Sequence, residues 1–328
     1  MKRSFIKIVV IIIAGALSLP ACVSQNPADK ELIPISVQLG WKHQAQFAGL
    51  YAADQQGYFA EEGLAVKFLP GGPEMDHLEP VLNGEAQFGV ISAPHLIEAR
   101  ARGEALTALA VFYRRSSVVL IAKEENGVTT PQDMLGKKIR TNVNLTPHIT
   151  AMLSYAGLSA DQYELVLLPS DVDMFASGEV PVWGAYLDGF ALTVEKAGFA
   201  INKIHPDDYG VHFYGDTLYT TDLLIEEDPD LVEGFTRAAL KGWQYAIEHH
   251  EDVGEMVAVY KGDIDVDLEN ERMLTMVPLI YTGEDEIGWM RAETWQGMVD
   301  MLSQQALLDA PVDVQDVYTL QFLEEIYP

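Results

Sequence analysis

The chain has little cysteine and little basic charge. Cys22 is its one cysteine, so no disulfide can form within the chain, and stability must come from a hydrophobic core that 328 residues are long enough to bury. There are 21 lysines and arginines against 49 aspartates and glutamates, which gives a formal net charge of -28. A surface this acidic repels nucleic acid and anionic lipid. We therefore expect a monomer that does not bind nucleic acid.

Several signatures of large enzyme classes are also absent. The sequence contains no GxGxxG, no Walker-type glycine loop, no HExxH and no GxSxG motif. His249 and His250 are adjacent, whereas two metal ligands on one helix need a spacing of three or four residues. The acidic run 263–267 lacks the glycine and the glutamate of an EF-hand. We expect neither a metal site nor a cofactor.

The N-terminal segment predicts export. Three basic residues among the first seven precede an apolar stretch too short to span a bilayer comfortably, which is typical of a signal peptide over residues 1–21. Leu19-Pro20-Ala21-Cys22 resembles a bacterial lipobox, which implies lipidation of Cys22 and a periplasmic protein anchored to the membrane. The alternative is an ordinary signal peptide with an incidental cysteine. Residues 22–32 are small and polar and predict a tether.

After this tether, strand-like and helix-like segments alternate, which predicts an α/β fold with parallel strands and helical crossovers. Strands are expected at 35–39, 65–69, 88–91, 105–112, 118–122, 138–141, 164–168, 180–185, 199–204 and 218–226. Helices are expected at 47–59, 77–83, 94–102, 129–136, 142–155 with Thr146 as cap, 229–248, 251–260, 269–279, 292–304 and 314–326.

The order of these segments predicts two lobes. We place residues 33–117 and 222–328 in lobe 1 and residues 118–221 in lobe 2, with the strand at 218–226 returning to lobe 1. The chain then crosses twice between the lobes, which suits a hinged pair with a ligand cleft between them.

The stretch 39–63 contains the first candidate site. In an α/β chain, residues just past the carboxyl end of a strand face the crevice where ligands bind. Trp41, Lys42, His43, Gln44 and Gln46 follow the predicted strand 35–39 in this way. The alternative is a strand-to-helix turn whose tryptophan only packs.

The segment that begins LGWKHQAQFAGLYAADQQGYFAEEGLAV and the later GEAQFGV resemble the opening of the NMT1/THI5-like group of periplasmic solute-binding proteins. Residues 214–221, YGDTLYTT, resemble the returning segment of a branch that also occurs as the sensor region of some bacterial kinases. The resemblance implies a two-lobed type II periplasmic binding protein, or Venus flytrap, in which each lobe is a mostly parallel sheet flanked by helices. Such a protein hands a small molecule to an ABC permease and its ATPase.

The resemblance further implies a flat heteroaromatic ligand, either a thiamine pyrimidine precursor or riboflavin, which requires an aromatic stack and a few directed hydrogen bonds. We expect Trp41 to stack on it, with His43, Gln44 and Gln46 at its edge. The other candidates lie in or beside the ends of predicted strands: Ser92, Tyr113, Asn142, Asn144, Thr146, Trp183, Tyr186, Asp188 and Asp216, of which Asp216 precedes its strand.

For three of these candidates a structural role is the alternative. Trp183 and Tyr186 suit the core of lobe 2, and Asp216 suits a turn that caps 214–215. The family often has Asn-Glu-Pro where this chain has Tyr186-Leu-Asp-Gly-Phe190, so Asp188 would replace the glutamate that grips an aminopyrimidine. Arg114 and Arg115 could instead hold an anion such as phosphate or sulfonate.

Two further functions stay open. A fungal pyrimidine synthase of the same family uses a lysine-bound pyridoxal phosphate, a histidine consumed as substrate and a cysteine-rich motif, of which this chain offers only the adjacent Lys42 and His43. The liganded protein could also dock on a membrane kinase as a sensor. The tryptophans at 243, 289 and 295 have helical spacing and predict core positions.

Overall fold

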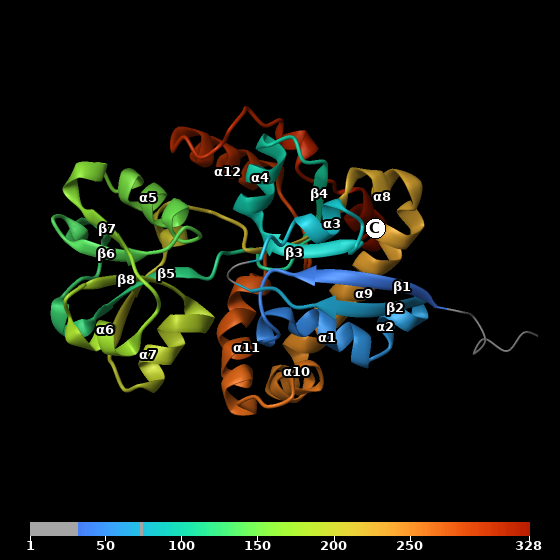
Figure 1. The fold of residues 1–328 in the computed structure, drawn as a ribbon, viewed down its shortest axis with the longest axis horizontal. Coiled ribbons are helices and arrows are strands. Elements are labelled where there is room, and N and C mark those ends of the chain that lie inside the picture. Colours follow the sequence, from blue (N-terminus) through green and yellow to red (C-terminus); the bar gives the residue numbers. More distant parts are fainter. Residues whose placement is uncertain (1–31, 73–74) are drawn as a thin grey trace, which may run out of the picture. The chain divides into compact units, whose positions relative to one another are not determined.

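The computed structural model describes residues 32–72 and 75–328. The predicted signal peptide, Cys22 and the tether up to residue 31 lie outside the described residues. Residues 32–328 form one unit that contains two five-stranded sheets (Figure 1). Among the described residues, no helix is both long and apolar enough to cross a bilayer.

The first sheet has the strand order β2-β1-β3-β10-β4. In that order its strands are Leu64–Leu69, Ile33–Leu39, Phe88–Ser92, Asp216–Thr221 and Leu106–Val111. β1 is parallel to β2 and β3, whereas β10 is antiparallel to both of its neighbours. The carboxyl ends of β1 and β3 therefore lie at the edge where β10 begins, and Asp216 is paired directly with Ser92.

The second sheet repeats this plan with the order β7-β6-β8-β5-β9. Its strands, in that order, are Glu164–Leu167, Lys138–Thr141, Val182–Tyr186, Val118–Lys123 and Ile201–Ile204. β6 is parallel to β7 and β8, and β5 is antiparallel to β8 and β9. In each sheet the antiparallel strand is the one that arrives directly from the other sheet.

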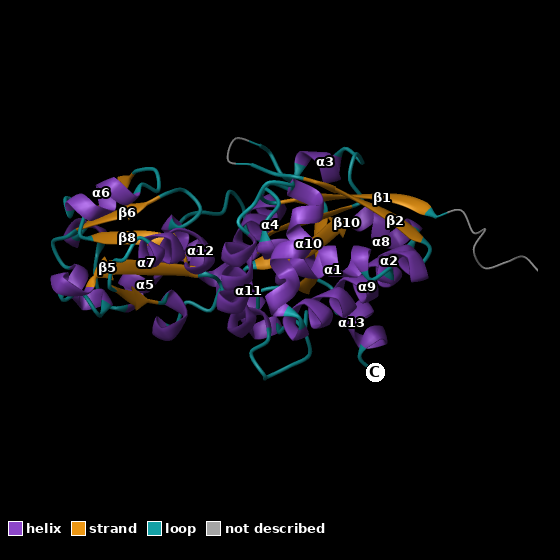
Figure 2. Ribbon diagram, turned by 90° about the horizontal axis from the view of Figure 1, so that it is seen from below, coloured by secondary structure: helices purple, strands orange, loops and turns teal. Residues whose placement is uncertain are grey.

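Helices cover both sheets, as Figure 2 shows. The helices of lobe 1 are α1 (Ala48–Gln55), α2 (Tyr58–Glu61), α3 (Glu79–Leu82), α4 (Ala93–Ala101), α8 (Asp222–Glu227), α9 (Pro229–Glu248), α10 (Val253–Lys261), α11 (Val266–Ile280), α12 (Ala292–Gln304) and α13 (Gln321–Ile326). Around the second sheet lie α5 (Thr146–Tyr155), α6 (Val172–Ser177) and α7 (Leu192–Lys196).

The packing of α1 on α9 depends on two glycines. A Cβ atom on Gly242 would lie 2.1 Å from the carbonyl oxygen of Gly49, and one on Gly49 would lie 2.2 Å from the ring of Trp243. The two backbones can approach this closely only without side chains. Trp243 and Trp295 are fully buried and Trp289 is half-buried, so the first two occupy the predicted core positions.

The two-lobed α/β class expected from the sequence is confirmed, and several local expectations are wrong, among them the single helix expected at 314–326, which is a short turn of helix at Val314–Asp316 and the separate helix α13. β10 belongs to the first sheet, so lobe 2 ends before Asp216 and not at residue 221. The expected strand 218–226 ends at Thr221, because the Thr221 hydroxyl accepts the N–H of Leu224 (3.1 Å) and starts helix α8. The expected helix 47–59 is divided at Gly57, whose φ of 78° is left-handed.

The segments that join the lobes lie side by side. The Ser116 N–H donates to the carbonyl of Phe213 (2.9 Å), and the Gly215 N–H donates to the carbonyl of Tyr113 (2.9 Å). Residues 113–116 and 213–215 thus run side by side between the lobes, and they are the candidate hinge.

Candidate functional site

A polar loop follows β1 and is fixed to helix α11. The Ala45 N–H donates to the buried carboxylate of Glu269 (2.7 Å), and the Trp41 carbonyl accepts the Gly71 N–H (2.9 Å). Arg272, one turn further along α11, has its Nε 3.6 Å from Glu269. The candidate loop of the sequence analysis is therefore held by charged residues that are remote in the sequence.

Three of the predicted site residues form one hydrogen-bonded chain. Arg272 donates to the Gln44 side-chain oxygen (3.2 Å), Gln44 donates to the Gln46 oxygen (2.7 Å), and Gln46 donates to Asp216 (2.7 Å). Because each amide donates in one direction and accepts in the other, Arg272 at one end sets the orientation of the whole chain. The Asp216 carboxylate is thus hydrogen-bonded to the loop after β1.

Asp216 and Asp188 form a pair of carboxyls contributed by opposite lobes. Burial, with the nearby charge of Asp188 as a smaller cause, raises the pKa of Asp216 to about 7, and the Gln46 hydrogen bond opposes this rise. Burial also raises the pKa of Asp188, although its backbone N–H, the Arg272 charge and a Ser117 hydrogen bond oppose the rise. The buried Asp188 carboxylate thus disfavours ionisation of the half-buried Asp216, and such a site can accept a hydrogen bond at an ionised carboxyl and donate one from a protonated carboxyl.

Tyr186 and Asn144 extend this site in lobe 2. Tyr186 lies at the end of β8, and its side chain is 37 % exposed overall. Burial of its hydroxyl raises the pKa of that group, and the charges of Asp216 and Asp188 also raise it. The Asn144 side chain lies close enough to Tyr186 and to His95 to influence the pKa of both, and the Nδ1 of His95 is 2.6 Å from the Ser92 hydroxyl. Ser92, Asn144 and Tyr186 therefore belong to the same polar cluster as the carboxyl pair.

Tyr113 supports the site from behind. Its side chain is buried, its hydroxyl donates to the Gln46 carbonyl (3.0 Å), and its ring packs edge-on against Trp243. Burial raises the pKa of this hydroxyl well above its usual value, so it stays protonated and keeps donating. The structure gives Tyr113 the role of positioning the loop.

Four other predicted site residues have local partners. The His43 Nδ1 is 2.9 Å from the Tyr51 hydroxyl, and burial lowers the pKa of His43. Trp183 is fully buried in the lobe 2 core, where its indole N–H donates to the Val180 carbonyl (2.8 Å). Asn142 accepts the N–H groups of residues 144 and 145, and Thr146 is the first residue of α5 and not its cap.

Trp41 is half-buried and packs against the hydrophobic core on one side. Within residues 32–72 and 75–328, no aromatic ring stacks on it. Its role as a stacking surface for a ligand stays a prediction.

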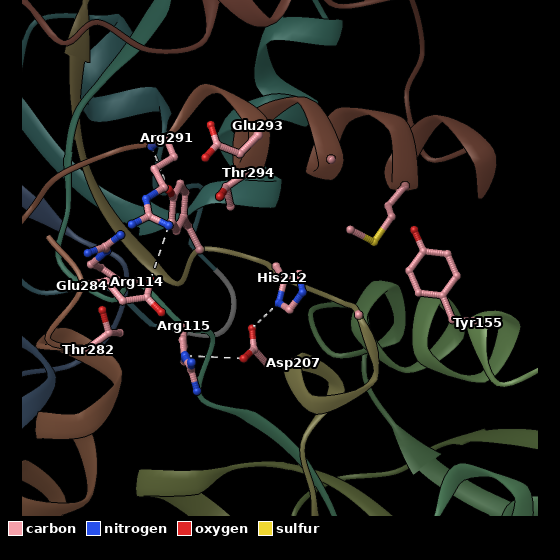
Figure 3. A pocket seen from close by; sticks show the side chains of 14 residues that line it. Arg114, Arg115, Tyr155, Asp207, His212, Thr282, Glu284, Arg291, Glu293 and Thr294 are labelled. Carbon is pink, nitrogen blue, oxygen red and sulfur yellow. Dashed lines mark hydrogen bonds and ion pairs between the residues drawn. The ribbon is translucent and has the colours of Figure 1, made fainter.

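Two pockets adjoin residues considered above. One, of about 670 Å³, is lined by residues of α4 and of the second sheet, Asn144 and Thr146 among them. The other, of about 430 Å³, is shown in Figure 3 and is lined by Arg114, Arg115 and Arg291. Both arginines considered for an anion have carboxylate partners, because Arg114 pairs with Asp285 and Arg115 lies 3.5 Å from Asp207.

Sequence reasoning missed Glu269, Arg272, His95 and Ser117. Glu269 and Arg272 lie on a segment whose pattern indicates only a helix, and a spacing of three residues is common on any helix surface. His95 lies in the first turn of α4, where a histidine carries no distinctive pattern.

These two sheets, joined by two crossing segments, have the two-lobed fold of the type II periplasmic binding proteins. The same fold occurs in the periplasmic aliphatic sulphonate binding protein SsuA of Escherichia coli, with a TM-score of 0.72, 16% sequence identity, and coverage of 88% of this chain and 99% of that chain. At this identity the likeness shows the fold alone.

The chain belongs to the NMT1/THI5-like family, whose model matches residues 44–253. The formylaminopyrimidine-binding protein of Halalkalibacterium halodurans is 25% identical over 97% of this chain and 98% of that protein. The riboflavin-binding protein RibY of Chloroflexus aurantiacus is 22% identical over 93% and 90%. A 4-amino-5-hydroxymethyl-2-methylpyrimidine phosphate synthase of Legionella pneumophila is 22% identical over 89% and 92%. Relatives that bind a solute and relatives that synthesise a pyrimidine thus share the family.

Proposed function

We propose that this chain is the solute-binding lipoprotein of an ABC importer, and that it captures a small, flat nitrogen heteroaromatic between its lobes. The observation that carries the proposal is the carboxyl pair of Asp188 and Asp216. A pyrimidine with an exocyclic amino group presents adjacent N–H donors and ring-nitrogen acceptors along one edge. A carboxyl that is ionised accepts from the amino group, and one that is protonated donates to the ring nitrogen.

Ligand capture on this proposal begins on the first lobe. Gln46 and Asp216 are already joined by a hydrogen bond, so the first-lobe half of the site is preorganised before a ligand arrives. Closure about the hinge would then bring Asp188 and Tyr186 onto the other edge of the ring. A ligand that contacts both lobes favours the closed state by its differential affinity for that state.

The aromatic contact of the proposal comes from Trp41. An indole face can stack on several kinds of flat ring, so it contributes affinity with little selectivity. The carboxyls and amides select ligands by the hydrogen-bonding groups along the edge of the ring. This division of roles supports a ligand class that includes both pyrimidines and flavins, the two kinds of compound named for the binding relatives.

We propose no catalytic turnover. Of the residues that the synthase chemistry requires, Lys42 is exposed and His43 is engaged with Tyr51, while Cys22, the one cysteine, lies in the predicted lipobox. These residues do not fit a lysine-bound pyridoxal phosphate with a cysteine-rich motif beside it. Export, lipidation of Cys22 and delivery to a permease are parts of the same proposal.

A calorimetric titration of the full chain tests it. We expect 4-amino-5-hydroxymethyl-2-methylpyrimidine or riboflavin to bind in the micromolar range or tighter, and propanesulfonate not to bind. Asp216→Asn should lower the affinity by roughly ten- to a hundredfold, because a hydrogen bond to a charged group contributes about 1.5–3 kcal/mol. Asp230→Asn, an exposed position at the start of α9, is the matched control. Binding of propanesulfonate but of neither heteroaromatic would refute the proposal.

A further inference from the structure

The pocket of about 670 Å³ has an unusually apolar rim. Three large apolar side chains around it are exposed: Val143 (76 %), Leu167 (68 %) and Leu307 (38 %). They come from the loop before α5, from strand β7 and from the segment after α12, which are far apart in the sequence. Single exposed apolar residues are ordinary, but three that converge on one pocket indicate a surface that something covers.

The pocket adjoins the carboxyl site. His95 lines the pocket, its Nδ1 is 2.6 Å from the Ser92 hydroxyl, and Ser92 is the residue paired with Asp216 between β3 and β10. Tyr186 is close enough to Asp188 and Asp216 for their charges to raise its pKa. A molecule whose polar edge meets the carboxyls can therefore extend past His95 into the apolar pocket.

Two properties of the pocket favour a small molecule as its occupant. Its volume lies in the range of about 300–1,000 Å³ that is usual for small-molecule sites. Its walls come from both sides of the hinge, since Pro94 and Glu98 belong to α4 while Leu165 and Leu167 belong to β7. A group held there would be enclosed by the same closure that completes the carboxyl site.

We infer that this pocket is a subsite for an apolar substituent of the ligand, an alkyl chain or a fused benzenoid ring. The inference rests on the proposed function, and it narrows the ligand class. The preferred heteroaromatic carries a donor edge for Asp188 and Asp216 on one side and an apolar group of several carbons on the other. An unsubstituted pyrimidine leaves the Val143 and Leu167 side chains exposed to water, as they are without ligand.

A homologous series of ligands tests this subsite. The probes are 4-amino-2-methylpyrimidines with a methyl, propyl or pentyl group at C5, titrated calorimetrically into the full chain. Each fully buried methylene strengthens binding about fourfold, so we expect a gain on the order of ten- to a hundredfold from methyl to pentyl in a pocket that buries the chain in part. The heat capacity of binding should become more negative along the series, which is the mark of apolar burial.

The variant Val143→Asn/Leu167→Gln adds polar groups at two exposed positions, so it should fold normally. We expect it to reduce pentyl binding by at least about tenfold and to leave methyl binding within about twofold. The matched control is Leu223→Gln, at a 60 % exposed position on α8 away from the pocket, and it should change neither.

Equal affinities for the methyl and pentyl compounds would overturn the subsite and leave the proposed function standing. The subsite is equally overturned if the double variant weakens both compounds by the same factor, and the apolar rim would then belong to a protein partner. Absence of binding by every pyrimidine and by riboflavin would overturn both the subsite and the proposed function.

Discussion

Asparagine in place of Asp216 should stabilise the protein without ligand, and increasingly so as the pH rises. Burial raises the pKa of Asp216 to about 7 from an ordinary value of 3.8, so the folded state binds this proton more tightly than the unfolded state does. The free energy of unfolding contributed by this group is therefore greatest below pH 3.8 and falls as the pH rises towards 7. Asparagine is neutral at every pH, so the variant does not lose this part of the free energy of unfolding as the pH rises.

The size of the effect follows from the pKa rise. A rise of about three units, at 1.36 kcal/mol per unit, corresponds to about 4 kcal/mol between the two limits of pH. Asp216 is half-buried and keeps its Gln46 hydrogen bond, so we expect roughly 2 kcal/mol or more in the variant's favour at about pH 8. For a chain of this size, with an unfolding entropy of about 2.1 cal/mol/K per residue, that gain raises the melting temperature by about 3 °C or more.

Thermal unfolding of the two proteins from about pH 4.5 to about pH 8.5, without ligand, measures this difference. The difference in melting temperature should be smallest at the acidic end, should grow up to about pH 7 and should then level off, whereas Asp230→Asn should give no such growth. The charge of Asp188 also raises the pKa of Asp216. When both proteins carry Asp188→Asn, the difference in melting temperature between the protein with Asp216 and its Asp216→Asn variant should therefore reach its full size at a lower pH. A difference that stays flat, or that grows as the pH falls, would show that Asp216 does not carry a raised pKa and would remove the main support for the carboxyl pair.

Three other perturbations separate binding from folding. Trp41→Ala should weaken the cognate ligand by about 2 kcal/mol, roughly thirtyfold by calorimetry, and an unchanged affinity would remove the stacking role. Glu269→Gln should lower the free energy of unfolding by about 1–3 kcal/mol in denaturant titrations, because the Ala45 N–H and Arg272 lose a charged partner; no change would mean that the loop is held elsewhere. Gly242→Ala should destabilise by about 1–3 kcal/mol or more, since its Cβ would lie 2.1 Å from the Gly49 oxygen, while Gly297→Ala on α12 has open space and serves as its control.

Much of the fold is predictable because it is encoded in local patterns. Apolar runs such as 35–39 and 118–122 predict strands that the structure contains, and the helix predicted at 229–248 has those bounds in the structure. The end of β10 is not predictable in this way, because residues 218–226 are β-forming throughout. Only the Thr221 hydroxyl, acting as a cap, decides that the strand stops there and a helix begins.

The site is predictable only in part, for a physical reason. The position of Gln44, Gln46 and Asp216 at strand ends places them in one region, because the ends of adjacent strands meet at one edge of a sheet. Whether an aromatic residue beside a strand faces the core or the cleft depends on the packing of its neighbours, so the sequence does not distinguish Trp183 from Tyr186. Arg272 reaches Gln44 across 228 positions of sequence, and no local pattern records such a contact.

The antiparallel strands have a consequence for the order in which the protein can fold. β10 lies between β3 and β4, so the first sheet stays divided until residues 216–221 are available to join its two halves. The second sheet, by contrast, uses one continuous stretch of chain, from β5 to β9. A chain that emerges N-terminus first can therefore complete its second lobe while the first is still open, and the lobe that begins first in the sequence is finished last.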